Sequence, residues 1–170
     1  MGNGIRVLMQ RAIPEGEENP QFDEAFELFK RYYLAHNKVK TRPYDGIMEL
    51  LGELKKRGVH MAIVSNKNQP TVEALCEEEF QGLISVAVGD GEGRARKPAP
   101  DGPMEAICRL GLSGTEGVLY VGDSEVDAQT AKNAGLGCVL VTWGFRTRQE
   151  MAPYSAFPFI DRPEELLEFV

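Results

Sequence analysis

The chain has 170 residues, of which 42% are hydrophobic and 26% are charged, so it is long enough to bury one sizeable core. Its net charge of −7 argues against a protein that binds nucleic acid or a membrane surface, because both partners favour a basic face. The sequence shows neither a signal peptide nor an apolar run near the roughly 20 residues that a membrane span needs. We therefore expect a soluble, cytoplasmic protein of one domain with a small accessory part.

The three cysteines are far apart in the sequence and form no Cys-x-x-Cys pair: Cys76, Cys108 and Cys138. An odd number of widely spaced cysteines is typical of reduced, mostly buried thiols in a cytosolic protein. We therefore predict free thiols.

The N-terminal part of the chain is predicted to be helical. Apolar residues are spaced loosely like a helix face over residues 5–13, and an acidic loop follows at residues 14–19. Apolar and aromatic residues keep helical spacing over residues 22–35, which predicts an amphipathic helix. A further helix is expected over residues 44–56, ended by Gly58.

From residue 59 onward, short apolar runs of strand length alternate with helical patterns. The predicted strands cover residues 59–64, 84–88, 118–121, 138–142 and 157–160, and the predicted helices cover residues 71–79, 101–110, a stretch up to Gly135, a segment near Arg148, and residues 163–169. Alternation at this spacing predicts an α/β fold with a doubly wound parallel sheet and right-handed crossovers.

The segment Val118–Gly135 combines a strand-length apolar run, a loop and a helical pattern. Its loop carries Asp123 and Asp127, so two carboxylates lie near the carboxyl end of a predicted buried strand, where open α/β sheets place their ligands. Carboxylates this close together usually need a cation. The alternative is that Asp123 caps the helix and Asp127 complements its dipole.

Two further loops follow predicted strands, and loops at the carboxyl ends of parallel strands converge on one crevice. Ser65 and Asn66 offer a hydroxyl and an amide at a helix start, an arrangement that binds anions, although Ser65 would also suit an ordinary helix cap. Lys97 lies in Arg-Lys-Pro-Ala-Pro, where prolines stiffen the loop, although it would also suit a solvated surface. Together with Asp123 and Asp127, these residues indicate Mg²⁺ beside a phosphate.

Three segments resemble the second, third and fourth motifs of the haloacid dehalogenase superfamily of hydrolases, in the same order. They are Ile-Val-Ser-Asn-Lys at residues 63–67, Lys-Pro-Ala-Pro-Asp at residues 97–101 and Gly-Asp-Ser-Glu-Val-Asp at residues 122–127. The sequence Val-Leu-Val-Thr-Trp-Gly-Phe-Arg at residues 139–146 resembles the phosphoglycolate phosphatase branch of that superfamily. The N-terminal helices resemble part of the helical cap of this branch.

The resemblance implies a Rossmann-like core over residues 44–170 and a partial helical cap over residues 1–43. It also implies Mg²⁺-dependent hydrolysis of a small phosphorylated metabolite, and we consider a homodimer as the assembly.

The resemblance further assigns roles to the candidate site residues. Ser65 is expected to bind the transferring phosphoryl group with help from Asn66, and Lys97 to neutralise the charge that builds up in the transition state. Asp123 is expected to bind Mg²⁺ directly. Asp127 is expected to act in the outer coordination shell of the metal or to pair with Lys97.

The nucleophile that the resemblance implies is not found in this sequence. The family forms an aspartyl-phosphate on an Asp at the end of its first strand, and a second Asp two residues later acts as general acid and base. This sequence has no such Asp-x-Asp pair, and its isolated aspartates follow no run that resembles a buried strand: Asp23, Asp45, Asp90, Asp101 and Asp161. We therefore expect a chain that is truncated relative to the family, begins inside the cap, and is inactive or severely impaired alone.

A missing first strand would also change the sheet. In the family this strand is central, between the strands that end at Ser65 and at Asp123, so its absence would leave two unpaired edges. Rearrangement, an intermolecular strand, or collapse of the flanking strands onto each other would close the gap. A continuous sheet with a strand drawn from residues 1–13 would contradict the cap interpretation.

Three other functions are weighed against hydrolysis. A catalytically inactive remnant would bind phosphate or Mg²⁺, or associate with a partner. A phosphoacceptor receiver module also places Asp and Lys at strand ends, but the order of the motifs fits it poorly. Dehalogenation, within the same superfamily, does not require the cation for which Asp123 and Asp127 are suited.

Some residues outside the motifs are candidates for contacts with the substrate. Arg6 or Arg11 could meet a substrate carboxylate, although a solvated arginine is the commoner case. Trp143 and Phe145 could form a wall of the crevice, and core packing is the alternative for both.

Overall fold

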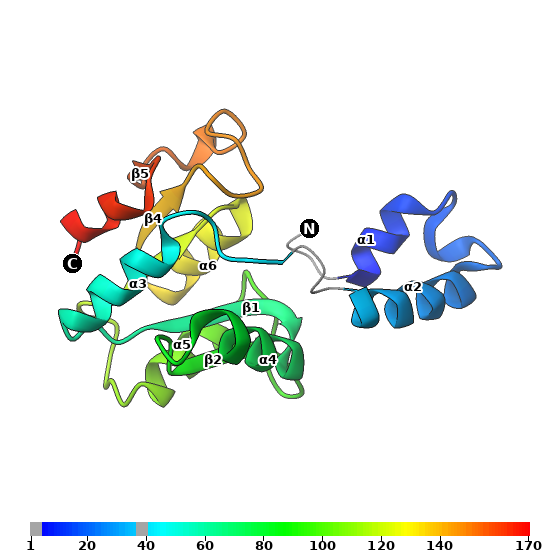
Figure 1. Cartoon of the computed structure of the whole chain (residues 1–170). Helices are drawn as coiled ribbons and strands as arrows, with labels where there is room; N and C mark the ends of the chain where they lie inside the picture. Colours follow the sequence, from blue (N-terminus) through cyan, green and yellow to red (C-terminus); the bar gives the residue numbers. More distant parts are fainter. Residues whose placement is uncertain (1–4, 37–40) are drawn as a thin grey trace. The chain divides into compact units, whose positions relative to one another are not determined.

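The structure, a computed structural model, describes residues 5–36 and 41–170 (Figure 1). The chain divides into two compact units, Met1–Arg42 and Pro43–Val170. The parts of the predicted cap at residues 1–4 and 37–40 lie outside the described residues, and the assignment of the first unit to a cap stays a prediction.

The first unit contains the helices α1 (Ile5–Ala12) and α2 (Phe22–His36), with the short 3-10 helix η1 (Gly16–Glu18) between them. Because residues 5–12 form a helix, they supply no strand to a sheet, and the cap interpretation is not contradicted.

Arg6 is a packing residue of the first unit. Its guanidinium lies 5.2 Å from the ring centre of Phe22 and 5.3 Å from that of Phe26, at distances typical of cation–π contacts. Its Nε also donates to Glu17 at 2.7 Å. These contacts, and not a substrate carboxylate, account for Arg6 in the structure.

The second unit alternates strands and helices, as the sequence predicts. Its elements in chain order are α3 (Ile47–Lys56), β1 (Ala62–Asn68), α4 (Gln69–Phe80), β2 (Val86–Asp90), α5 (Asp101–Arg109), β3 (Leu119–Gly122), α6 (Glu125–Ala134), β4 (Gly137–Val141), η2 (Ala152–Tyr154), β5 (Phe159–Ile160) and η3 (Pro163–Glu168). The helix predicted near Arg148 is wrong, because a turn and the 3-10 helix η2 occupy this segment. Pro153 lies within η2 and has no N–H to donate to a preceding turn of α-helix.

The strands form two parallel sheets and not one continuous sheet (Figure 1). β1 pairs with β2, and β3, β4 and β5 pair in that order. Within the described part of the chain, no ladder joins β1 to β3, so the two strands have not collapsed onto each other. Each is the edge strand of its sheet, which leaves the expectation of a missing central strand uncontradicted.

The most deeply buried strand is β4. Cys138, Val139 and Leu140 are 3%, 0% and 0% exposed. By contrast, Val121 on β3 is 42% exposed, so the prediction of a buried strand at residues 118–121 is wrong for this side chain. A parallel strand is buried when both faces of its sheet are covered, which is most complete in the middle of a sheet, and within the described residues β3 is an edge strand paired with β4 only.

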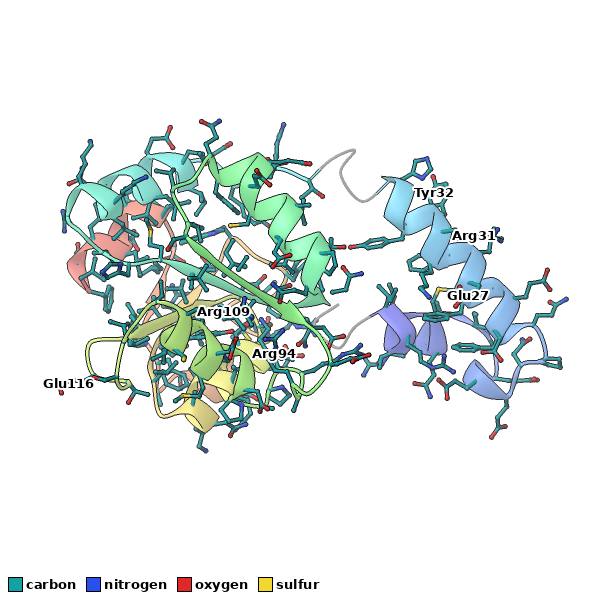
Figure 2. All side chains as sticks on the ribbon, turned by 90° about the horizontal axis from the view of Figure 1, so that it is seen from below. Glu27, Arg31, Tyr32, Arg94, Arg109 and Glu116 are labelled. Carbon is teal, nitrogen blue, oxygen red and sulfur yellow. The ribbon has the colours of Figure 1, made fainter. Side chains whose placement is uncertain are left out.

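The outer edge of β2 is covered by side chains. The Gln69 side chain donates to the carbonyl of Ala87 at 2.9 Å and accepts the N–H of Gly89 at 2.7 Å. Arg94 donates to the carbonyl of Gly89 at 2.9 Å, and Arg109 donates to that of Ala87 at 3.5 Å (Figure 2). These bonds occupy backbone groups that an added strand would otherwise use.

Two expectations drawn from composition can be compared with the structure. All three cysteines are free thiols, with Cys76 and Cys138 buried and Cys108 exposed. Burial raises the pKa of Cys76, and it raises the pKa of Cys138 to about 12, which makes both thiols poor nucleophiles.

In the described ranges, none of the helices combines the length and the apolar character needed to cross a membrane.

The difference in burial between β4 and β3 predicts different costs for removing an apolar side chain. Leu140→Ala leaves a cavity in the core and is expected to lower the free energy of unfolding by about 3 kcal/mol. Val121→Ala, on the half-open strand, is expected to cost less than about 1 kcal/mol. Urea unfolding of both variants measures the difference, and equal losses would show that β3 is covered in solution.

Candidate active site

The candidate residues come from the carboxyl ends of three strands. Asn66 lies in β1, where the pairing register with β2 shifts between Val64 and Asn68 and frees the segment between them from the regular ladder. Lys97 lies in the loop between β2 and α5. Asp123 follows β3, and Asp127 lies in the first turn of α6. Because the strands are parallel, these four predicted residues all lie at the carboxyl ends of strands.

The centre of the site is an ion pair between Lys97 and Asp127. Lys97 Nζ lies 2.8 Å from Asp127 Oδ1, and the two side chains are 14% and 8% exposed. Two charges removed this far from water are stable only when each has its partner and further hydrogen bonds. The pair therefore ties the Lys97 loop to the start of α6.

Hydrogen bonds occupy both oxygens of Asp127. Oδ1 accepts from Lys97 Nζ and, at 3.4 Å, from the hydroxyl of Tyr120. Oδ2 accepts from the hydroxyl of Ser124 and, at 3.3 Å, from the N–H of Asp123. A carboxylate has about four lone-pair positions, so the described donors fill its capacity. Of the two roles expected for Asp127, the structure shows the pairing with Lys97.

The pKa values of Asp123 and Asp127 are shifted in opposite directions. Burial by itself raises the pKa of Asp127, but the Lys97 ammonium and the hydrogen bonds outweigh burial and hold that pKa below its usual range. Burial raises the pKa of Asp123, the Phe145 N–H opposes this rise, and the charge of Asp127 adds to it. Asp123 is therefore the carboxylate whose ionised form would gain most from an added cation.

The Asn66 side chain holds the backbone of Lys97. Its Nδ2 donates to the Lys97 carbonyl at 3.2 Å, and its Oδ1 accepts the Lys97 N–H at 2.9 Å. From α6, Asn133 donates to the carbonyl of Pro98 at 2.7 Å. Asn66 therefore positions Lys97, a role that the sequence did not predict, and its contact with phosphate stays a prediction.

The Asp123 carboxylate is held by the backbone that follows β4. Its Oδ2 accepts the N–H of Phe145 at 2.7 Å. A Cβ at Gly144 would overlap the Asp123 side chain, so only glycine allows this approach. Ser124 is the N-cap residue of α6, and the alternative of Asp123 as a helix cap is therefore not supported.

Ser65 lies beside Asn66 at the same end of β1. Its hydroxyl accepts the N–H of Lys67 at 3.2 Å, which closes a local turn. The alternative of Ser65 as the helix cap is wrong, because Asn68 caps α4 by accepting the N–H of Thr71. Its contact with a phosphoryl group stays a prediction.

One aspartate of this edge differs from the sequence-based prediction. Asp90 ends the buried strand β2, although no isolated aspartate was expected to follow such a strand. Gly89 interrupts the apolar run before it, which hid the end of the strand. Asp90 pairs with Arg96 at 2.5 Å and has no second Asp two residues later, so it does not restore the missing motif.

Four further residues contribute to the site and are not among those predicted from the sequence: Tyr120, Ser124, Asn133 and Gly144. Tyr120 lies two residues before the motif at residues 122–127, and Ser124 lies within that motif. Gly144 lies in the segment that carries the resemblance to phosphoglycolate phosphatases. The signals in the sequence that could have identified them are the polar side chains of Tyr120, Ser124 and Asn133 and the small size of Gly144.

The structure gives limited support for a metal site built from protein side chains alone. Within residues 5–36 and 41–170, no three His, Cys, Asp or Glu side chains come together in a group that could hold a metal ion. A metal bound here would use Asp123 and would take further ligands from water or substrate.

Comparisons with known proteins agree with the motifs. Residues 1–141 match the haloacid dehalogenase-like hydrolases. Phosphoglycolate phosphatase 1 of Pseudomonas aeruginosa is 31% identical over 173 residues, which cover 98% of this chain and 63% of that protein. The phosphoglycolate phosphatase of Aquifex aeolicus is 28% identical over 172 residues, which cover 100% of this chain and 76% of that protein. The chain thus spans less than two thirds of the length of the Pseudomonas relative.

Solved structures show the same fold. A protein from Lactobacillus delbrueckii, proposed to be a phosphoglycolate phosphatase, superposes with a TM-score of 0.92 at 35% identity, over 99% of this chain and 79% of that one. A further such protein from Haemophilus somnus has a TM-score of 0.83 at 28% identity, over 99% of this chain and 78% of that one.

The Lys97–Asp127 pair predicts a pH-dependent contribution to stability. Asp127→Asn leaves the Lys97 charge without its partner and is expected to lower the free energy of unfolding by about 3 kcal/mol near neutral pH. Because the folded-state pKa of Asp127 lies below the ordinary 3.8, the contribution is present above 3.8 and is lost as pH falls through the lowered pKa.

Urea unfolding at about pH 7 and about pH 3 measures this difference. Asp161→Asn, at a carboxylate with 63% exposure that pairs with Arg148, is the matched control and should change little. A loss for Asp127→Asn that is the same at both pH values would contradict the role of the ion pair.

Proposed function

The chain belongs to the haloacid dehalogenase-like hydrolase family, and on this premise we propose that its site serves the Mg²⁺-dependent hydrolysis of a small phosphate monoester. The observation that carries the proposal is the buried Lys97–Asp127 pair beside Asp123, at the carboxyl ends of parallel strands. The relatives named phosphoglycolate phosphatases support that branch. The substrate would be a small phosphorylated metabolite.

Lys97 would bind the phosphoryl group. Its ammonium has three N–H donors, and among the described residues one of them bonds to Asp127, which leaves two for phosphate oxygens. Asn66 fixes the backbone of Lys97, and Asp127 fixes its charged end. A cation held in place before the reaction stabilises the charge that develops on the phosphoryl oxygens.

Asp123 fits the role of a single carboxylate ligand for Mg²⁺. Proteins usually bind this ion through one or two carboxylates, with water and substrate phosphate completing the octahedron. One oxygen of Asp123 accepts the Phe145 N–H, and burial disfavours its charge in the absence of a cation. When bound, Mg²⁺ would supply positive charge for the phosphoryl oxygens.

The attacking carboxylate is not among these residues. The family motif for it is Asp-x-Asp, and the 170-residue sequence contains none. We therefore expect this chain alone to be inactive or severely impaired. Within the described residues, β1 and β3 are each paired on one side only, so a strand that carries the carboxylate could pair with them. Such a strand would have to come from outside these 170 residues, because a second copy of the chain also lacks the Asp-x-Asp motif.

The alternative function is a catalytically inactive member of the family that binds phosphate or Mg²⁺, or associates with a partner. The lack of an Asp-x-Asp pair is the observation that favours it. The family match argues against the receiver module.

Hydrolysis of p-nitrophenyl phosphate with Mg²⁺ distinguishes the two functions. If the chain assembles a working site, turnover should be measurable and should fall by at least about 100-fold in Asp123→Asn, which removes the ligand charge. Asp161→Asn, at an exposed carboxylate, should leave it unchanged.

Binding of inorganic phosphate without turnover would support the inactive alternative. Turnover that Asp123→Asn leaves unchanged would contradict the assigned site. A chain that neither turns over the ester nor binds phosphate or Mg²⁺ would contradict the assigned phosphate and metal site, and would leave only association with a partner.

A further inference from the structure

The segment that follows β4 contacts the site through its backbone. Trp143 packs against a core cluster that includes Val139 and Val141 of β4, and the N–H of Phe145 donates to Asp123 Oδ2 at 2.7 Å. The Phe145 side chain is 67% exposed, so the backbone of this residue, and not its ring, makes the contact with the site. The expected role of Phe145 as a wall of the crevice has no support in these contacts.

An ion pair fastens this segment to the start of α6. Arg146 Nε lies 2.8 Å from Glu125 Oε2, and Arg146 Nη2 lies 2.9 Å from Glu125 Oε1. Two parallel bonds between a planar guanidinium and a carboxylate restrict both position and orientation. Glu125 is the first residue of α6 and lies two residues from Asp123 and from Asp127.

Gly144 makes the arrangement sterically possible. A side chain at this position would overlap the Asp123 carboxylate and push the backbone away from it. The segment can therefore approach Asp123 closely enough for the Phe145 N–H to bond, and it stays there while Arg146 is bound to Glu125.

We propose that the Glu125–Arg146 pair and residues 144–146 form a positioning device for Asp123. The pair holds the backbone, and the Phe145 N–H fixes Oδ2, which orients the other carboxylate oxygen toward a divalent cation. This inference rests on the proposed function for the cation. Both side chains of the pair are more than one third exposed, so the pair contributes little to global stability and acts mainly on the orientation of Asp123.

Amide hydrogen exchange tests the device without a cation. In Arg146→Met, the Phe145 N–H should exchange at least about 10-fold faster than in the wild type, because the backbone that carries it is no longer held beside Asp123. The charge swap Glu125→Arg with Arg146→Glu should restore slow exchange. Arg148→Met, which breaks the exposed pair with Asp161, is the matched control and should not change the exchange of Phe145.

Titration with Mg²⁺, followed by calorimetry, tests the consequence. Arg146→Met should weaken the affinity by about 10-fold or more, while the midpoint of thermal unfolding changes by less than about 3 °C. Arg148→Met, at the exposed pair with Asp161, should bind as the wild type does.

The outcomes separate this inference from the proposed function. Unchanged exchange of the Phe145 amide in Arg146→Met would overturn the positioning device. If the wild type binds Mg²⁺ through Asp123, an unchanged Mg²⁺ affinity of Arg146→Met would overturn it as well. A wild type that binds no Mg²⁺, with exchange behaving as expected, would contradict the proposed function and the orientation toward a cation, and would leave only the hydrogen-bonded contact.

Discussion

The buried ion pair between Lys97 and Asp127 is the constraint on which the site depends. Burying two charges is costly, and the surrounding residues offset that cost by filling the hydrogen-bonding capacity of the carboxylate. Asn66 then fixes the backbone of Lys97 from β1. Through these contacts, β1, the loop before α5 and the start of α6, which are distant in the sequence, are held together at the proposed phosphate site.

The strand edges of the two sheets differ in whether other groups occupy their backbone hydrogen-bonding positions. Gln69 and two arginines occupy the outer edge of β2, which protects it against pairing with another strand. β1 and β3, which carry site residues at their carboxyl ends, are each paired on one side, and Val121 is half exposed. The open sides thus lie next to the proposed chemistry, as expected if a further strand contributes to the site.

Much of the fold could be predicted from the sequence because helical and strand periodicities are local. The position of Asn66, Lys97, Asp123 and Asp127 at one edge could be predicted because each follows or ends a predicted parallel strand, and the carboxyl ends of such strands lie together. The contacts of Asn66 with Lys97 and of Asp123 with Phe145 join residues 31 and 22 positions apart, and no local pattern encodes them. The exposure of β3 could not be predicted either, because it depends on which strands flank it.

The central claim is that Lys97, held by Asp127, is the phosphate-binding cation of this site. Calorimetric titration of the chain with inorganic phosphate in the presence of Mg²⁺, compared with Lys97→Met, tests it most directly. The account predicts that the wild type binds phosphate and that the variant loses at least about 10-fold in affinity, since a charge-assisted hydrogen bond is removed. Equal affinity in the two proteins, or no binding by the wild type, would contradict the account.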